Sequence, residues 1–258
     1  MNVDSNSYTF GFATIMVIIV AALLSYAAIE LKPFQDRNIE LEKQQNILSS
    51  VGIKVERDLA EDAYAKYIKK EIVLNYKGEE VEGSAFEIEL GKELKKDNSA
   101  QLLPLFISNI DSAKQYIIPL RGKGLWGPIW GFIALEEDLN TVYGAVFDHK
   151  GETPGLGAEI NQSFFQEPFI GKKIFEGETF KSIRVVKGGA PEGDNYGVDG
   201  ISGGTITSDG VTDMLLERLN MYLPYITNIK AKIEAEKLVT DIDSVLILND
   251  SLIQLDYE

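Results

Sequence analysis

A run of 25 residues without a charged side chain or a proline, residues 5–29, constrains this chain more than any other stretch. About 20 apolar residues suffice for a helix to cross the hydrocarbon core of a bilayer. Aromatic side chains favour the two membrane interfaces, and the run carries them near its ends at Tyr8, Phe10, Phe12 and Tyr26. We therefore predict a transmembrane helix over about 8–29, within an N-terminal segment 1–32.

A cleaved secretory signal is the alternative interpretation of this run. Ser25-Tyr26-Ala27 has a faint likeness to a cleavage site. The apolar run is longer than a typical signal core, however, and the residues before it include Asp4 but no Lys or Arg. We therefore predict a retained anchor.

The charges that follow the run give a weak signal for orientation. Lys32, Arg37 and Lys43 would place the C-terminal part in the cytoplasm by the positive-inside rule. Acidic residues are mixed among them at Glu30, Asp36, Glu40 and Glu42. The charge pattern alone therefore does not fix the side of the membrane.

Composition excludes several classes of function. The formal net charge of -15 predicts that the chain repels nucleic acid. It has no cysteine and one histidine, His149, so thiol catalysis and Cys- or His-rich metal sites are excluded. We predict no metal site and no catalytic side chain. Any redox chemistry must come from an organic cofactor.

Patterning after the anchor predicts an α+β protein. Pro33 should end or offset the anchor helix. Apolar spacing predicts two further helices over 36–51 and 57–76, so that 33–80 forms a helical stalk or cover. Strand signals begin near Phe86. They continue in short apolar runs that predict a twisted, mostly antiparallel sheet flanked by helices, at 102–107, 115–120, 129–135, 141–147 and 180–186.

The C-terminal part begins with an amphipathic helix predicted over 210–226, whose regular part Pro224 should end. We place a globular domain at 81–226 and an acidic C-terminal segment at 227–258. A further helix is expected over 230–238.

A glycine-rich stretch, 199–210, lies directly before this helix and reads Asp-Gly-Ile-Ser-Gly-Gly-Thr-Ile-Thr-Ser-Asp-Gly. A helix that starts here points free N–H groups and a partial positive charge into the loop, which suits a phosphate. The stretch has no Walker lysine and lacks the dinucleotide-binding spacing. Its generic interpretation is a turn that caps a surface helix.

Two further loops carry groups that suit a flat ring system. Residues 121–128 contain Leu125 and Trp126, whose apolar faces can stack on a ring. Residues 148–159 contain Glu152 and Thr153, which offer polar atoms, within a span shaped by three glycines and a proline. Taken one at a time, these loops are ordinary turns, and His149 is an ordinary surface or hydrogen-bonded residue.

Taken together, these motifs resemble one family. The stretch 199–205 is similar to the Asp-x-x-Ser/Thr-Gly-Ala-Thr signature at which a transferase attaches FMN to threonine, with Gly204 in place of the usual alanine. It follows His-Lys-Gly-Glu-Thr-Pro-Gly-Leu-Gly at 149–157 and Val-Val-Lys-Gly-Gly at 185–189. This order is similar to that of the C subunit of the sodium-translocating NADH:quinone oxidoreductase; the G subunit of the Rnf complex is the close paralogue.

The resemblance implies a site for covalent FMN. Thr205 would carry the phosphoester, with the phosphate contacted by Ser202, Gly203, Gly204, Ile206 and Thr207. Leu125, Trp126, Leu156 and Gly157 would lie against the isoalloxazine. The polar edge of the ring would meet Glu152, Thr153 and Lys187.

The resemblance also implies partners and a location. The chain would pass electrons one at a time from an iron–sulfur centre to another covalent flavin in the B subunit. Its partners, the A, B, D, E and F subunits, would complete a complex that reduces quinone and exports sodium. A flavin transferase would modify the chain outside the cytoplasm. We therefore expect a single-pass protein of the inner membrane with a periplasmic domain, against the weak charge signal.

Two other functions stay open at this stage. A membrane-anchored flavoprotein that works alone, or serves another reductase, has the same anchor and the same flavin motif. An extracytoplasmic binding module without a cofactor is the alternative in which the glycine-rich loops are only turns.

Overall fold

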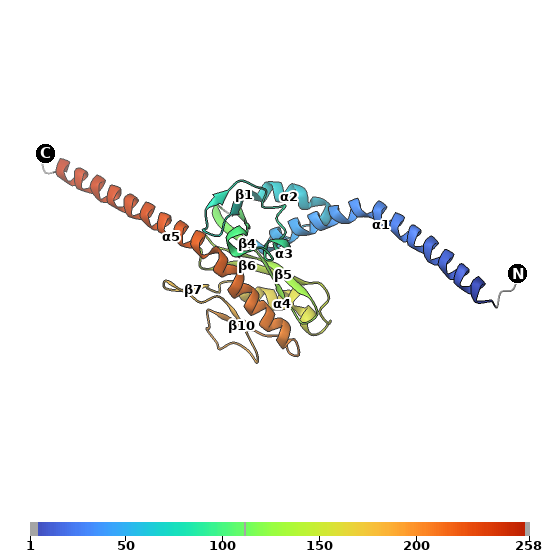
Figure 1. The fold of residues 1–258 in the computed structure, drawn as a ribbon. Coiled ribbons are helices and arrows are strands. Elements are labelled where there is room, and N and C mark those ends of the chain that lie inside the picture. Colours follow the sequence, from blue (N-terminus) through green and yellow to red (C-terminus); the bar gives the residue numbers. More distant parts are fainter. Residues whose placement is uncertain (1–4, 111, 256–258) are drawn as a thin grey trace.

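The computed structural model describes residues 5–110 and 112–255, and side chains up to residue 235. Helix α1, Asn6–Ser50, carries the N-terminal apolar run and extends away from the rest of the protein (Figure 1). Its large apolar side chains between Phe10 and Phe34 are exposed. Within the described ranges, α1 is the one helix long and apolar enough to cross a membrane.

Pro33 does not end this helix, so of the two outcomes predicted for it, an end or an offset, the first is wrong. It lies inside α1, and the separate helix expected over 36–51 is the continuation of the same element. A proline removes one backbone hydrogen bond and bends a helix without necessarily ending it, and α1 bends partway along its length (Figure 1). The end of α1 is held on the domain by the buried Ile47 and Leu48.

A six-stranded antiparallel sheet forms the centre of the protein, in the order β2-β1-β3-β4-β5-β6. Most of its strands are near-continuous apolar runs, as expected for strands that are covered on both faces. Their bounds are β1 Ile68–Leu74, β2 Glu80–Val81, β3 Leu103–Ile110, β4 Ala113–Lys123, β5 Pro128–Leu135 and β6 Val142–His149.

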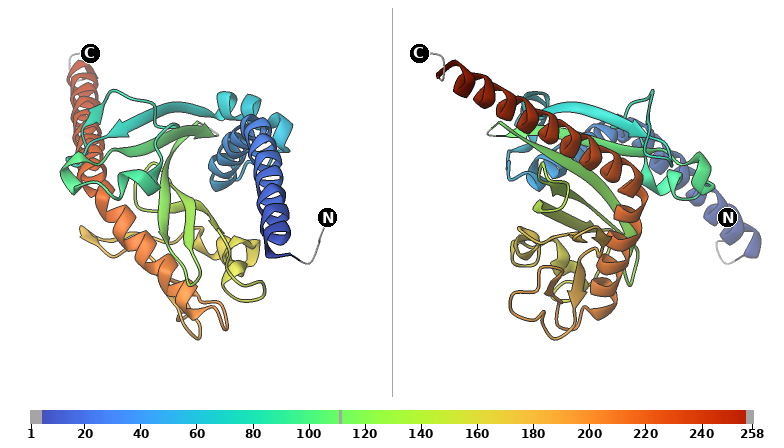
Figure 2. Two further views of the ribbon diagram at one scale, coloured as in Figure 1. Left: turned by 45° about the vertical axis from the view of Figure 1, so that its right-hand side comes forward. Right: turned by 90° about the vertical axis from the view of Figure 1, so that its left-hand side faces the viewer.

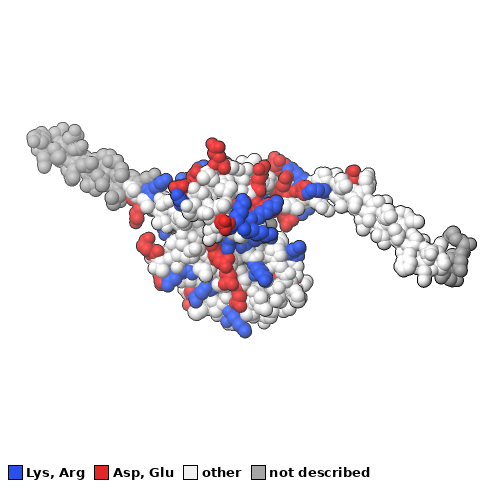
Figure 3. Space-filling model, viewed as in Figure 1, with Lys and Arg blue, Asp and Glu red and all other residues white. Residues whose placement is uncertain are grey.

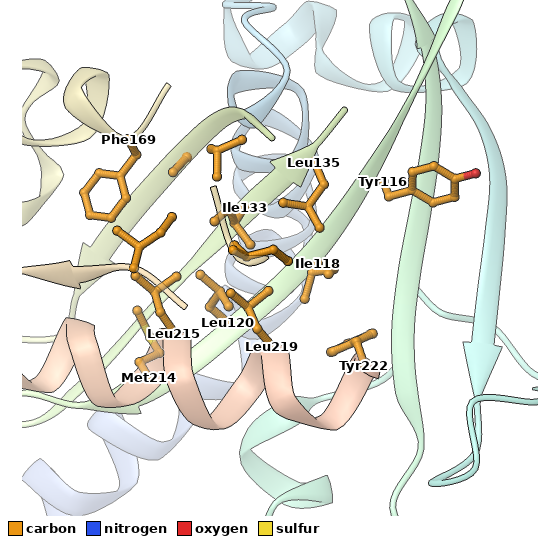
Figure 4. Close-up of a cluster of buried hydrophobic side chains, with 14 of the residues drawn as sticks. Tyr116, Ile118, Leu120, Ile133, Leu135, Phe169, Met214, Leu215, Leu219 and Tyr222 are labelled. Atoms are coloured by element: carbon orange, nitrogen blue, oxygen red, sulfur yellow. The ribbon is translucent and has the colours of Figure 1, made fainter. Parts of the chain in front are cut away.

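Helix α5, Thr205–Leu255, covers one face of this sheet, and the end of α1 lies against the other (Figure 2). Successive residues of a strand point to opposite faces. In β4, Tyr116, Ile118 and Leu120 belong to the core under α5, whereas Ile117 belongs to the core that contains Ile47. Figure 4 shows the first core, where α5 contributes Met214, Leu215, Leu219 and Tyr222.

Shorter elements complete the fold. Two short helices lie between α1 and the sheet: η1, Arg57–Leu59, and α2, Ala60–Tyr67. Two more connect β2 to β3: α3, Leu90–Glu93, and η2, Asn98–Ala100. After β6 come η3 Gly157–Asn161, α4 Ser163–Gln166, η4 Glu167–Phe169, the hairpin β7 Phe175–Glu176 with β8 Thr179–Phe180, and the parallel pair β9 Arg184–Val186 with β10 Gly197–Asp199. The predicted α+β class, with a mostly antiparallel sheet and flanking helices, is confirmed.

Several predicted elements differ from the structure. The helix expected over 57–76 ends at Tyr67, because the following residues pair with β3 as strand β1. No strand begins at Phe86, and the run 180–186 is divided between β8 and β9. The helix expected from 210 begins at Thr205 and continues without a break through Pro224 and 230–238. The residues at 256–258 of the predicted C-terminal segment lie outside the described ranges.

Candidate functional site

Three loops meet at the N-terminal end of α5: the β4–β5 loop, the loop after β6, and the glycine-rich stretch before α5. Glu152 joins all three. Its Oε2 accepts a 2.6 Å hydrogen bond from the Thr207 hydroxyl, and its Oε1 accepts a 2.9 Å bond from the Trp126 N–H. The sequence-predicted segments around Trp126, Glu152 and Thr207 are therefore brought together in space.

The Glu152 carboxylate is buried, with only 5% of the residue exposed. Burial acts to raise its pKa, but hydrogen bonds from Thr207 and from the backbone N–H groups of Trp126, Leu125 and Gly127 outweigh this, so the pKa is lowered. Glu152 is thus ionised at neutral pH and directed into the protein. This geometry favours a role in holding the β4–β5 loop in position rather than in direct contact with a ligand.

Gly157 makes this arrangement possible by its lack of a side chain. A Cβ at this position would lie 2.3 Å from Thr207 Oγ1 and 2.7 Å from Glu152 Oε2. No side chain larger than hydrogen fits there without breaking the Glu152–Thr207 bond. Gly157 is buried and so supports the site from within.

The first turn of α5 contains three hydroxyl groups with different surroundings. Thr207 is buried and bound to Glu152, and the Ser208 hydroxyl accepts a 3.2 Å bond from the Ile201 N–H. Thr205 is partly exposed, and its hydroxyl makes no hydrogen bond to the described part of the chain. Of these three groups, Thr205 is the one available for modification.

Exposed apolar side chains lie on the segments that adjoin this threonine or meet at the start of α5. Leu156 lies against the glycine-rich stretch, because a Cβ on Gly203 would come within 2.6 Å of its Cδ2. Ile206 follows Thr205 on α5, and Trp126, 70% exposed, lies on the loop that Glu152 holds. An exposed group of this kind, with Leu125 as a further member, suits a flat ring that covers it.

The stretch around Lys187 is aligned with the glycine-rich motif by the parallel pair β9 and β10. Val186 pairs with Asp199, and its carbonyl accepts a 2.9 Å bond from the Gly200 N–H. Asp199 Oδ1 accepts a 2.8 Å bond from the Ala190 N–H, which fixes the turn between them. The Lys187 side chain is exposed beside this turn.

The remaining predicted residues lie within these same segments. Ser202 and Gly203 are exposed, and Gly204 is buried. Thr153 is exposed, and its carbonyl accepts bonds from the N–H groups of Leu156 and Ala158. Every predicted site residue therefore lies on the loops that meet here or on the adjoining turn after β9.

His149 has a supporting position that the sequence interpretation did not assign. Its Nδ1 accepts a 3.1 Å bond from the Glu152 N–H, which fixes the start of the loop that carries Glu152. Its Nε2 is buried and has no hydrogen-bond partner among the described residues. The one feature of the sequence that could have indicated this supporting role is the position of His149, three residues before Glu152 at the end of β6.

Comparisons with known proteins identify the family. Residues 124–220 match the FMN-binding domain family. The chain is 35% identical over 225 residues to the C subunit of the Na(+)-translocating NADH-quinone reductase of Vibrio vulnificus strain YJ016, covering 81% of this chain and 88% of that protein. The chain belongs to the family of Na(+)-translocating NADH-quinone reductase C subunits. The predicted resemblance is confirmed.

Other members of the C-subunit family agree. The Haemophilus ducreyi protein is 32% identical over 249 residues, which cover 89% of this chain and 96% of that protein. The crystal structure of the C subunit from Parabacteroides distasonis matches with a TM-score of 0.72 at 46% identity and covers 76% of this chain and 97% of that one. The FMN-binding domain match contains every predicted site residue, from Leu125 to Thr207.

Proposed function

We propose that this protein carries FMN as a phosphoester on Thr205 and serves as an electron-transfer subunit of the sodium-pumping reductase. The observation that carries the proposal is the contrast within the first turn of α5. Thr207 and Ser208 are buried and hydrogen-bonded, whereas the Thr205 hydroxyl is accessible and unbonded within the described part of the chain.

The start of α5 suits the phosphate of such an ester. The N–H groups of Thr205, Ile206 and Thr207 donate to no described residue, because the first helical bond runs from the Ser208 N–H to the Gly204 carbonyl. Free N–H groups at a helix N-terminus bind anions and carry a partial positive charge. Ser202 and Gly203, both exposed, complete the turn around this position.

The apolar groups around Thr205 would hold the isoalloxazine. Bound FMN supplies the one-electron redox chemistry that no side chain of this cysteine-free chain provides. Trp126, Leu125 and Leu156 would cover the ring, and Thr153 would bond to its polar edge. The exposed Lys187 ammonium would favour negative charge at the pyrimidine end. Glu152 and Gly157 support these contacts from behind.

A covalent bond suits a ring that lies close to the surface. Retention of the cofactor then does not require deep burial, so a redox centre on a partner can approach closely. The chain would pass electrons singly from an iron–sulfur centre to another covalent flavin in the B subunit. The A, B, D, E and F subunits would be its partners, with α1 as a single-pass anchor and the domain on the periplasmic side.

Mass analysis of the peptide that contains Thr205 tests the attachment. From cells that make the flavin transferase, the native peptide should be heavier by FMN less one water, and the band should fluoresce on a denaturing gel. Thr205→Ala should abolish both signals, while Thr179→Ala, which removes an exposed hydroxyl outside the motif, retains them. Covalent flavin on the Thr205→Ala protein would refute the assignment. Copurification with the other subunits tests the assignment to the complex.

A further inference from the structure

A groove of about 600 Å³ lies where the end of α1 meets the sheet, and it includes none of the flavin-site residues. Helix α1 contributes Ile39, Lys43 and Asn46 to its wall, and α3 borders it on another side. The floor contains apolar side chains of the sheet, among them Leu120, Trp130 and Phe132. The groove therefore combines an apolar floor with polar groups from the two helices.

Four cationic side chains line the groove: Lys43, Lys92, Lys95 and Arg121. In a chain with a net charge of -15, this is a local reversal of sign. Figure 3 shows a group of Lys and Arg side chains near the centre of the domain, bordered by acidic ones. Two acidic residues, Glu42 and Glu89, also line the groove.

Two of the four cations already have partners. Lys92 forms a 2.8 Å ion pair with Glu89, and the Lys43 ammonium bonds to the Phe86 carbonyl and lies over the Phe86 ring. Arg121 and Lys95 form no side-chain ion pair or hydrogen bond with any described residue. These two groups have their charge free for a ligand.

Arg121 is held in position although it has no counterion. It is half-buried at the end of β4, and its guanidinium lies against α3, where a Cβ on Gly91 would come within 2.8 Å of its Nε. A guanidinium presents five N–H donors in a fixed plane and binds phosphate in a bidentate manner. Gly91 thus gives room for an oriented phosphate-binding group at the edge of the groove.

The groove is formed in part by the same helix, α1, that carries the predicted membrane span. The predicted span ends at about residue 29, and Ile39, which is exposed, begins the groove wall ten residues further along α1. Ten residues of helix correspond to about 15 Å, a distance from the hydrocarbon core that a tilt of α1 shortens.

We propose that this groove binds one anionic phospholipid of the leaflet that borders the domain. The Arg121 guanidinium and Lys95 ammonium contact the phosphate, and the apolar floor covers part of the glycerol and the adjoining chain. The lipid is preferred to an acidic protein segment because of the apolar floor and because one wall of the groove belongs to the anchor helix itself. The lipid would fix the angle between the anchor and the domain. The proposal does not depend on the flavin.

Lipid retention by the full-length protein tests this assignment. The protein is placed in nanodiscs of equal parts phosphatidylglycerol and phosphatidylcholine, and native mass spectrometry records the lipids that remain bound on release. We expect phosphatidylglycerol to be retained in preference, with one molecule per chain. The K95Q/R121Q double variant should lose this retention roughly tenfold or more.

Two comparison variants distinguish lipid binding in the groove from a general electrostatic attraction between anionic lipid and the protein surface. R57Q/K114Q removes the same charge from exposed positions outside the groove and should retain the lipid as the native chain does. Gly91→Ala keeps every charge but displaces the Arg121 guanidinium, and it should weaken retention. Equal retention of both lipids by the native chain, or equal loss in the two double variants, would overturn the proposal. Loss of a copurifying subunit in K95Q/R121Q, with lipid retention unchanged, would also overturn it and indicate a protein partner.

Discussion

The Thr207 hydroxyl donates a 2.6 Å hydrogen bond to Glu152 Oε2, across 55 residues of sequence. Thr205, two residues earlier, lies on the other side of the same turn, because positions two apart on a helix differ by about 200° in direction. The helix thus directs one threonine of the motif into the protein and leaves the other at the surface. This division favours a structural role for Thr207 and modification of Thr205.

The Glu152–Thr207 bond should contribute measurably to stability. Thr207→Val leaves a buried carboxylate without one donor, and hydrogen bonds to charged groups contribute about 1.5–3 kcal/mol. Urea unfolding of the flavin-free protein should show a loss of that size. In a double-mutant cycle with Glu152→Gln, the two losses should be less than additive. Fully additive losses would mean that the bond does not contribute to stability.

The same carboxylate predicts a dependence on pH. The pKa of Glu152 is lowered in the folded protein, so its contribution is present above the ordinary glutamate pKa of about 4.3 and is lost as the pH falls below it. Thermal unfolding at pH 7 and below pH 4 should therefore differ less in Glu152→Gln than in the native protein. Glu159→Gln removes a charge from an exposed bond to the Gly155 N–H in the same loop. The Glu159→Gln variant should therefore show the same difference in thermal unfolding between pH 7 and below pH 4 as the native protein.

Neighbouring glycines of the motif should respond differently to alanine. Gly203 has φ +75°, and its Cβ would lie 2.6 Å from Leu156 Cδ2, so Gly203→Ala should destabilise the loop by more than about 1 kcal/mol and reduce flavin attachment. Gly204 has no positive φ, and its nearest contact would be 3.0 Å from Ile201 Cγ2. Gly204→Ala should retain attachment. Mass analysis of the Thr205 peptide from both variants tests this difference. Equal flavin attachment in the two variants would contradict the prediction.

Much of the sheet could be predicted because its strands are nearly uninterrupted apolar runs. The predicted runs at 102–107, 115–120, 129–135 and 141–147 correspond to β3, β4, β5 and β6. Strand β1 could not be predicted for two reasons. A bulge between Ile68 and Lys70 breaks the alternation of apolar and polar residues, and the strand follows helix α2 without a connecting loop. Its pairing with β3 outweighs the local helical pattern.

The site could be predicted from sequence only as a set of motifs. Order along the chain brought Trp126, Glu152 and Thr205 into one hypothesis, but nothing local showed that Glu152 is directed inward. That follows from Gly157, Thr207 and the N–H of Trp126, which meet the carboxylate only in the folded protein. Side-chain direction at a loop depends on distant contacts, which periodicity does not encode.

Trp126 should affect the flavin far more than it affects the fold. The residue is 70% exposed, so Trp126→Ala should change the free energy of unfolding by no more than about 0.5 kcal/mol. Covalent attachment should persist, because the Thr205 hydroxyl and the start of α5 are unchanged. If the indole stacks on the isoalloxazine, its removal should raise the flavin fluorescence of the purified protein. Trp126→Phe keeps an aromatic face and should stay closer to the native emission. Unchanged emission in Trp126→Ala would place the ring away from this side chain, and loss of attachment would mean that Trp126 is needed by the transferase.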